Sequence, residues 1–325
     1  MNTKYLLFFL SIFIFAKIDY AQSDEYNMSE LICKESQSFI SNNRIQNTQN
    51  KLSSNNDFDM KYYRFEWNIN PNTNYISGTA TSYFLTKIDN ISTLEYDLSS
   101  SLVVDSIQYH QTNISFTQSG SYGLSIQLPN NLPINTLDSV SITYHGMPPS
   151  NGFGSFIQST HNNTPILWTL SEPFGAQDWW PCKNGLTDKI DSIDVYVTTP
   201  SNYKVASNGI LKEEYIVDTN TIFHWKHSYQ IAPYLIAIAV TDYTVYNDTV
   251  HLSNGVSMPM MNYVYPENIT AARTGTNKLV KVLEFFDSLF INYGFYKEKY
   301  GHAQFGWGGG MEHQTMSFVI NFNDE

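Results

Sequence analysis

Two glutamates lie in local sequences that predict a binding role for their carboxylates. Glu312 follows the glycine run in GWGGGMEHQTMS (306–317), and Glu172 lies in TLSEPFGAQDWWPCKNG (169–185). A carboxylate accepts short, strong hydrogen bonds from an ammonium group, and two carboxylates together recognise the free amine at a chain end. The two segments therefore predict a site for a free α-amine, formed by Glu172 and Glu312.

Other interpretations of the same residues stay open at this point. The glycine run at 306–310 is either a flexible tether or a strand edge that a second backbone approaches closely. Glu172 precedes Pro173 and is also typical of a turn or a helix cap, and Glu312 is also typical of an exposed strand end. For the aromatic cluster that follows Glu172, plain core packing is the prediction. Its members are Trp179, Trp180 and Cys182.

The motifs of the common hydrolytic centres do not occur in the sequence. It contains no HExxH, no GxSxG and no P-loop. His224 and His227 are three residues apart in a predicted strand, so they face opposite sides and cannot share a metal. The two cysteines, Cys33 and Cys182, cannot form a tetrahedral zinc cluster, and their polar and aromatic settings disfavour a disulfide between them. These residues predict no catalytic residue and no metal ligand.

Composition and charge limit the class of protein. The chain has 325 residues, enough for two domains, and its 23 Tyr and 20 Phe indicate a folded protein. The net charge is −12, and no cluster of Lys and Arg forms the positive groove that a nucleic acid requires. We therefore expect no nucleic-acid partner.

The first residues predict a secretory signal peptide over 1–21. Lys4 precedes the apolar run YLLFFLSIFIFA (5–16), and polar sequence follows the small residue Ala21. A membrane anchor needs about 20 apolar residues, and this run is shorter. We therefore expect a secreted or periplasmic protein without a stable membrane span. Residues 22–57 are rich in Ser, Asn and Gln and predict a poorly ordered lead-in.

The middle of the chain has the periodicity of β-strands. Apolar and polar residues alternate in strand-sized runs that turn residues separate. These runs are YYRFEWNI (62–69), ISGTATSYFLT (76–86), SLVVDSIQYH (101–110), YGLSIQL (122–128), VSITYHG (140–146) and DSIDVYVTTP (191–200). The apolar run YLIAIAV (234–240) predicts a further strand, buried on both faces. The spacing indicates an antiparallel β-sandwich over 58–245.

The period changes after about residue 246. In TNKLVKVLEFFDSLF, apolar residues recur at the spacing of an amphipathic helix, which we predict over roughly 267–291. The residues concerned are Leu279, Val282, Leu283, Phe286, Leu289 and Phe290. MSFVINF (316–322) predicts another strand. The protein is therefore predicted to be mainly β, with the start of an α/β domain over 246–325.

Taken together, the two glutamate segments resemble one known family. GGMEH (309–313) resembles the GxMEN signature of the zinc aminopeptidases typified by aminopeptidase N and leukotriene hydrolase. SEPFGAQDWWPC resembles their upstream segment, in which a Glu precedes a Pro-Cys pair. The resemblance covers roughly 58–325. It implies a saddle-like β-sandwich followed by a thermolysin-like catalytic domain that is incomplete here.

The resemblance also implies roles for individual residues. Gly309 and Gly310 would lie on an edge strand that pairs with the substrate peptide. Glu312 and Glu172 would bind its free α-amine, and Met311 would line the first side-chain pocket. Zinc is implied as the cofactor of the full-length enzyme, with peptides that have a free N-terminus as substrates.

The sequence departs from the family pattern in three places. His313 occupies the position where the family has Asn, and residues 183–185 read KNG where relatives have an acidic-proline segment. The family's HExxH motif, with its zinc ligands and general base, does not follow Glu312. We therefore expect a secreted zinc aminopeptidase represented by an N-terminal portion that does not hydrolyse peptides alone. The alternatives are a non-catalytic, secreted β-sandwich protein that binds peptide N-termini, and an epoxide hydrolase-like relative.

Overall fold

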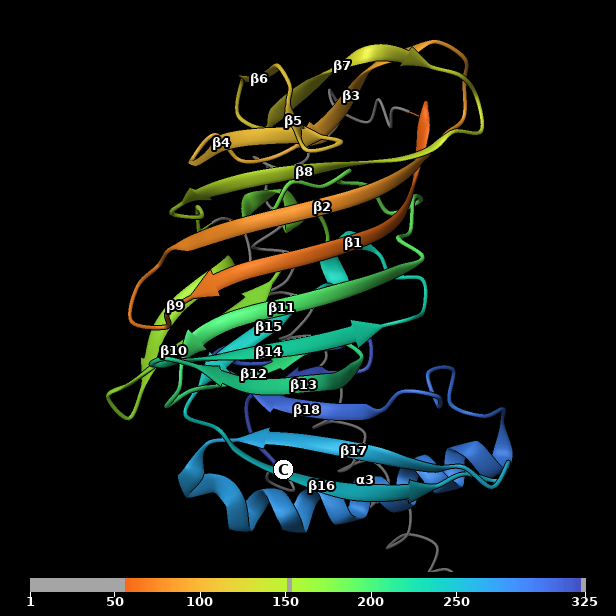
Figure 1. Ribbon diagram of the computed structural model, residues 1–325. Helices are drawn as coiled ribbons and strands as arrows, with labels where there is room; N and C mark the ends of the chain where they lie inside the picture. Colours follow the sequence, from red (N-terminus) through yellow and green to blue (C-terminus); the bar gives the residue numbers. More distant parts are fainter. Residues whose placement is uncertain (1–55, 151–153, 323–325) are drawn as a thin grey trace, which may run out of the picture. The chain divides into compact units, whose positions relative to one another are not determined.

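The computed structural model describes residues 56–150 and 154–322 (Figure 1). The described residues all belong to one compact unit within residues 54–325. The predicted signal peptide and residues 22–55 of the predicted lead-in lie outside the described residues.

Strands make up most of the described chain. Those before residue 171 are β1 (Phe58–Ile69), β2 (Ile76–Thr86), β3 (Ile91–Asp97), β4 (Leu102–Tyr109), β5 (Thr112–Asn113), β6 (Phe116–Ser119), β7 (Gly123–Leu132), β8 (Leu137–Gly146), β9 (Ser155–His161) and β10 (Thr164–Leu170). The later strands are β11 (Ser192–Pro200), β12 (Lys204–Ser207), β13 (Ile210–Val217), β14 (Asn220–His227), β15 (Ile238–Thr241), β16 (Thr244–His251), β17 (Ser257–Val264), β18 (Tyr300–Gln304), β19 (Gly310–Met311) and β20 (Ser317–Val319). The helical elements are α3 (Ile269–Leu289) and the 3₁₀ turns η1 (Ala176–Asp178), η2 (Pro233–Leu235) and η3 (Pro266–Asn268).

An eight-stranded sheet forms the first layer of a sandwich. Its strand order is β13-β14-β11-β1-β2-β8-β4-β5 (Figure 1). Alternation along β1 turns Phe65 and Trp67 into the core and leaves Glu66 and Asn68 exposed on the outer face. The β-sandwich prediction is confirmed, with one difference: β1 and β11 run parallel. A long excursion of the chain separates these two strands, which a parallel connection requires.

A four-stranded sheet, β12-β15-β10-β9, lies behind the first layer, and a three-stranded sheet, β3-β7-β6, lies at one end (Figure 1). Aromatic rings fill the core between the layers. The rings of Trp67 and Trp179 have centroids 4.8 Å apart. The indole N–H of Trp67 donates to the hydroxyl of Tyr144 (2.9 Å), which donates to the carbonyl of Trp179 (3.0 Å). This chain of hydrogen bonds satisfies polar groups that burial would otherwise penalise.

A five-stranded mixed sheet follows, with the order β16-β17-β18-β20-β19. Helix α3 connects the parallel neighbours β17 and β18 and packs on the sheet through Leu279 and Leu283. This is a β–α–β unit, so the predicted α/β segment is confirmed in kind. The apolar side of α3 is wider than the sheet covers: Phe286 is 51 % exposed and Phe290 is 73 % exposed.

One predicted strand is wrong at its start. The run YLIAIAV begins with the turn η2, and the strand β15 begins only at Ile238. Pro233 explains the difference, because its fixed φ favours the first position of a helical turn. The predicted domain boundary near 245 coincides with the start of the five-stranded sheet at β16, and it stays a prediction.

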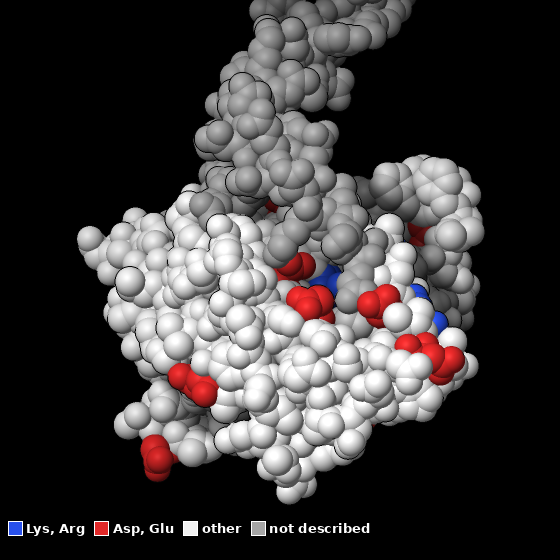
Figure 2. Space-filling view, turned by 90° about the horizontal axis from the view of Figure 1, so that it is seen from above, with Lys and Arg blue, Asp and Glu red and all other residues white. Residues whose placement is uncertain are grey.

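The described residues show no helix that is both long and apolar enough to cross a membrane. Figure 2 views the protein from the end that carries β3, β6 and β7 in Figure 1. On this face acidic side chains are scattered, with few basic ones among them.

Gly209 lies in the turn between β12 and β13, and it allows a test of how closely this turn packs against β14. Its φ is +80°, and a Cβ there would lie 2.0 Å from the carbonyl oxygen of Lys226. Gly255 has a similar φ of +85° but open space around it. We expect Gly209→Ala to lower the free energy of unfolding by roughly 3 kcal/mol, and Gly255→Ala by only about 1 kcal/mol.

Urea unfolding followed by tryptophan fluorescence measures both changes. Equal losses in the two variants would show that the left-handed backbone, and not the contact with Lys226, sets the requirement for glycine.

Candidate functional site

Glu172 lies in the turn that follows β10. Its neighbour Ser171 is buried and accepts a hydrogen bond from the indole N–H of Trp179 (2.9 Å). Gly175 closes the turn through a hydrogen bond from its N–H to the carbonyl of Ser171 (2.7 Å). A Cβ at Gly175 would lie 2.3 Å from the Ser155 hydroxyl, so the turn is tightly packed. Glu172 itself is half-buried at the surface of this turn.

The aromatic cluster after Glu172 is part of the core, as predicted. Trp179, Trp180 and Cys182 are all 0 % exposed. The backbone of Cys182 exchanges two hydrogen bonds with Asp97, of 2.7 and 3.0 Å. This packing fixes the end of the segment that carries Glu172, and it leaves these three side chains no surface for a ligand.

The glycine run ends on a sheet edge. Gly310 and Met311 form β19, which pairs with β20 on one side and is the last strand of its sheet. Gly309 precedes this strand, and a Cβ there would lie 2.4 Å from the ring of Trp307. The edge interpretation therefore holds for Gly310, while Gly306, Gly308 and Gly309 precede the strand. Met311 is 3 % exposed and belongs to the main core, so its place in a substrate pocket stays a prediction.

Glu312 follows β19 directly and is exposed. Burial raises the pKa of Glu172, and repulsion from the Glu312 carboxylate raises it further. Burial likewise raises the pKa of the Tyr234 phenol, with added contributions from Glu172 and Glu312. The Glu172 and Glu312 carboxylates thus repel each other, and both disfavour ionisation of the Tyr234 phenol. A cation bound there would relieve the repulsion.

The topology of the four-stranded sheet explains why these groups meet. β10 and β12 both pair antiparallel with β15. The last residues of β10 and β12 therefore lie at the same end of the sheet as the first residue of β15. Glu172 follows β10, and Tyr234 lies in η2 just before β15. Sequence reasoning missed Tyr234 because it was assigned to the strand. Pro233 before it is the signal that marks a turn at this edge.

The Asn208 carboxamide, which follows β12, ties this edge to the loop after Glu312. Its nitrogen donates to the carbonyls of Leu235 (3.0 Å) and Gln314 (2.7 Å), and its oxygen accepts from the N–H of Ala237 (2.8 Å). One side chain therefore fixes both the turn of Tyr234 and the loop of Glu312.

Lys299 adds a second anchor for the same loop. Its ammonium group donates to the carbonyls of Thr315 (2.8 Å) and Ser207 (3.2 Å), and Lys299 is 1 % exposed. Burial lowers the pKa of Lys299 to about 7. The N–H of Gly209 donates to the Thr315 hydroxyl (2.7 Å). Sequence reasoning missed Lys299 because KEKY has the composition of a solvent-exposed loop.

The end of β14 completes the anchoring. The amide of Gln314 donates to Nε2 of His227 (3.0 Å), whose Nδ1 pairs with the Glu298 carboxylate (2.5 Å). His227 and Glu298 are both buried, while His224 faces the opposite side of β14 and pairs with Asp194. The prediction that the two histidines cannot share a metal is confirmed by this geometry.

His313 lies beneath the loop and away from the solvent. It is 2 % exposed, and neither ring nitrogen has a hydrogen-bond partner among the described residues. Its ring meets that of Phe318 edge-on, with centroids 4.4 Å apart. Burial lowers the pKa of His313 to about 3, so the imidazole is neutral at pH 7.

Among the described residues, no three His, Cys, Asp or Glu side chains are placed to hold a metal ion. These residues therefore do not fit a zinc ion, and we assign no catalytic step through zinc to them. The pair of carboxylates, Glu172 and Glu312, stays the predicted site.

The sequence profile of the Peptidase M1 N-terminal domain matches residues 59–235. The chain belongs to the M1 peptidase family. This match covers β1 to η2 and therefore includes Glu172 and Tyr234. A search of curated proteins by sequence finds no match.

Solved structures of M1 enzymes share the fold. The M1 zinc metallopeptidase from Deinococcus radiodurans matches with a TM-score of 0.72 at 16 % identity, over 83 % of this chain and 61 % of that one. A mutant of the Deinococcus enzyme bound to a Tyr-Ser-Ala substrate matches with a TM-score of 0.68 at 17 % identity, over 83 % and 62 %. Yeast LTA4 hydrolase matches with a TM-score of 0.68 at 20 % identity, over 82 % and 41 %. The M1 chain thus spans less than two thirds of the length of these structures.

The repulsion between the two glutamates is directly measurable. We expect Glu312→Gln to lower the pKa of Glu172, because it removes the neighbouring negative charge while burial remains. Titration of the side-chain carboxyl carbons by NMR gives this pKa. Glu213→Gln, on the exposed face of β13, is the control for the loss of one surface charge. If the pKa of Glu172 is unchanged in Glu312→Gln, the two carboxylates do not interact and the interpretation is wrong.

Burial of His313 predicts an acid-sensitive fold. Its pKa is about 3 in the folded state and 6.5 without the protein environment. Between these values the unfolded chain binds a proton that the folded chain does not, so stability falls as the pH drops from 6.5 towards 3. The limit for this one group is about 5 kcal/mol.

We expect His313→Asn to reduce this loss, measured as the free energy of unfolding in urea across the pH range. His251→Asn, at the exposed end of β16, is the control for the loss of an imidazole. The interpretation is wrong if both variants keep the slope of the parent chain.

Proposed function

We propose that this M1 chain is the part of a secreted zinc aminopeptidase that holds the free N-terminus of a peptide. Glu172 and Glu312 receive the α-ammonium group. The observation that carries this proposal is the position of Glu312 directly after the edge strand β19. The pKa of Glu172, which burial and the Glu312 carboxylate both raise, supports it. An ammonium group between them neutralises charge that is otherwise repulsive.

The strand edge supports a peptide rather than a small amine as the ligand. β19 pairs with β20 on one side, and no described strand pairs with its other side. An extended peptide adds to such an edge through main-chain hydrogen bonds, and its side chains then alternate in direction. Gly309 and Gly310 keep this edge accessible, and Glu312 follows it directly. The peptide's N-terminus is thereby placed at the carboxylates.

Relatives support the ligand class. The mutant Deinococcus enzyme was solved with the peptide Tyr-Ser-Ala, and another M1 structure with L-tryptophan. These ligands carry a free α-amine, which is the group that two carboxylates would bind. Hydrolysis in zinc metallopeptidases needs a zinc site, which the described residues do not supply. The role proposed for this chain is therefore binding, with zinc chemistry belonging to a full-length enzyme.

Secretion is part of the proposal. The basic start, the apolar run 5–16 and the small residue Ala21 support export by a signal peptide. A secreted enzyme of this kind would meet peptides outside the cytoplasm.

A titration of the full chain with Tyr-Ser-Ala tests the role of the two glutamates. We expect the free peptide to bind and its N-acetylated form to bind at least about tenfold more weakly, because acetylation removes the positive charge. Glu172→Gln and Glu312→Gln should each weaken binding of the free peptide by about tenfold, measured by calorimetry.

Glu213→Gln is the matched control, since it removes a carboxylate from the exposed edge strand β13. Equal affinity for the free and acetylated peptides would refute the amine site. If binding depends on the free amine but not on Glu172 or Glu312, then other residues bind the amine and the proposed role of the two glutamates is wrong.

A further inference from the structure

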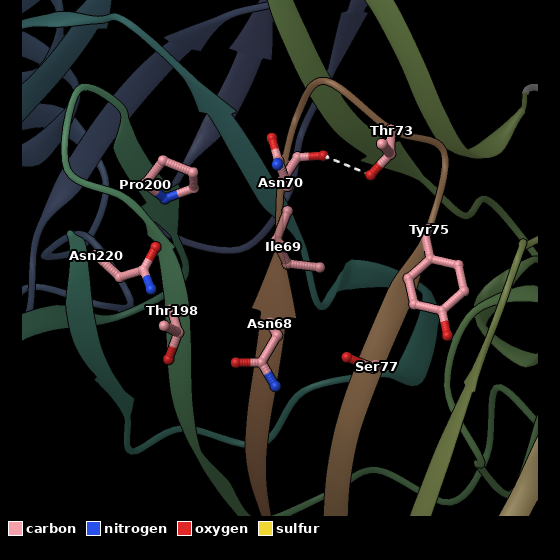
Figure 3. A pocket seen from close by; sticks show the side chains of 9 residues that line it. All are labelled: Asn68, Ile69, Asn70, Thr73, Tyr75, Ser77, Thr198, Pro200 and Asn220. Atoms are coloured by element: carbon pink, nitrogen blue, oxygen red, sulfur yellow. Dashed lines mark hydrogen bonds between the residues drawn. The ribbon is translucent and has the colours of Figure 1, made fainter. Parts of the chain in front are cut away.

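A cavity of about 230 Å³ opens on the outer face of the eight-stranded sheet, at the end where β1 and β11 finish (Figure 3). In the sheet register, Asn68 on β1 lies between Ser77 on β2 and Thr198 on β11. Asn220 on β14 lies opposite Pro200, at the end of β11. The cavity is therefore lined by a row of short polar side chains whose spacing the strands fix.

The polar groups of this row have unused hydrogen-bonding capacity. Among residues 56–150 and 154–322, no hydrogen bond joins the side chain of Asn68, Ser77, Thr198 or Asn220 to another residue. Two carboxamides and two hydroxyls offer both donors and acceptors towards the cavity. Figure 3 shows these side chains on neighbouring strands along one side of the opening.

The rim of the cavity is a turn that hydrogen bonds hold in place, one within the turn and one to a residue outside it. The N–H of Thr73 donates to the carbonyl of Asn70 (3.0 Å), and the amide of Asn72 donates to the hydroxyl of Tyr203 (3.0 Å). Tyr75 ends this turn and is 40 % exposed. Its ring stands at the edge of the cavity (Figure 3). The site thus has an ordered rim that holds an exposed aromatic face.

The lining carries no Asp, Glu, Lys or Arg, and it includes apolar atoms of Ile69 and Pro200. A phosphate or a carboxylate would find no cation here, and an ammonium group would find no carboxylate. An extended peptide would find no strand edge, because β14, β11, β1 and β2 are all paired on both sides. The remaining match is a neutral ligand with hydroxyls around a compact apolar body.

We propose that this cavity binds one ring of a neutral sugar, independently of the amine site. A pyranose ring has hydroxyls at its rim that match the amides and hydroxyls of the row. It also has a C–H face that packs on an aromatic ring such as Tyr75. The pocket is open to solvent and small, with a volume of about 230 Å³, which suits a single ring and not a long oligomer.

Saturation-transfer NMR on the full chain, with the methyl glycosides of β-D-glucose, α-D-mannose and N-acetyl-β-D-glucosamine, tests this site. We expect at least one of them to bind with a Kd on the order of 1 mM, as suits a small open site. Sorbitol carries the same hydroxyls without a ring, and it should give no saturable signal.

Tyr75→Ala and Asn68→Ala should each weaken this binding by about tenfold. Tyr83→Ala is the matched control, because Tyr83 is also 40 % exposed but lies on β2 outside the cavity. Thermal unfolding of all three variants shows whether the fold is kept. The proposal is overturned if no glycoside binds, if sorbitol binds equally well, or if Tyr83→Ala and Tyr75→Ala behave alike.

Discussion

The Asn208 carboxamide makes the contact on which the geometry of the proposed amine site depends. Its three hydrogen bonds join the end of β12, the start of β15 and the loop after Glu312. Glu172 follows β10 in the same sheet. The two carboxylates therefore come from segments that are far apart in the chain and from two different sheets, and the hydrogen bond from Asn208 to Gln314 links those sheets. A site built on strand ends keeps its geometry better than one built on free loops.

The hydrogen bonds that anchor this loop oppose the electrostatic repulsion between Glu172 and Glu312. Burial raises the pKa of Glu172, and repulsion from the Glu312 carboxylate raises it further, so both effects disfavour the ionised form of Glu172. The buried Lys299 and the His227–Glu298 pair are also costly to desolvate. Their hydrogen bonds to the loop and to neighbouring backbone offset part of that cost. The result is a well-anchored loop after β19. Its exposed carboxylate, Glu312, would be stabilised by a bound cation.

Sequence periodicity predicted the strands and the helix that turn one apolar face towards a core. β2 was predicted at 76–86 and is found there, and α3 lies within its predicted range. The strand edge at Gly310 was predictable because glycine there has a reason only if another backbone approaches. Tyr234, Asn208 and Lys299 were not predictable, since their partners depend on which strands β15 and β18 pair with. A buried lysine in KEKY gives no local signal, because its acceptors are the carbonyls of Ser207 and Thr315.

The sandwich also separates its two candidate sites. Trp67 points inward and Asn68 outward from adjacent positions on β1, so the cavity of Asn68 lies on the face opposite the core. The amine site belongs to the edge of the second sheet, beyond that core. Substitutions at distant positions with no shared partner act additively on stability. The lining of the cavity includes none of the residues of the proposed amine site, so a sugar at Asn68 would not compete with a peptide at Glu312 for the same side chains.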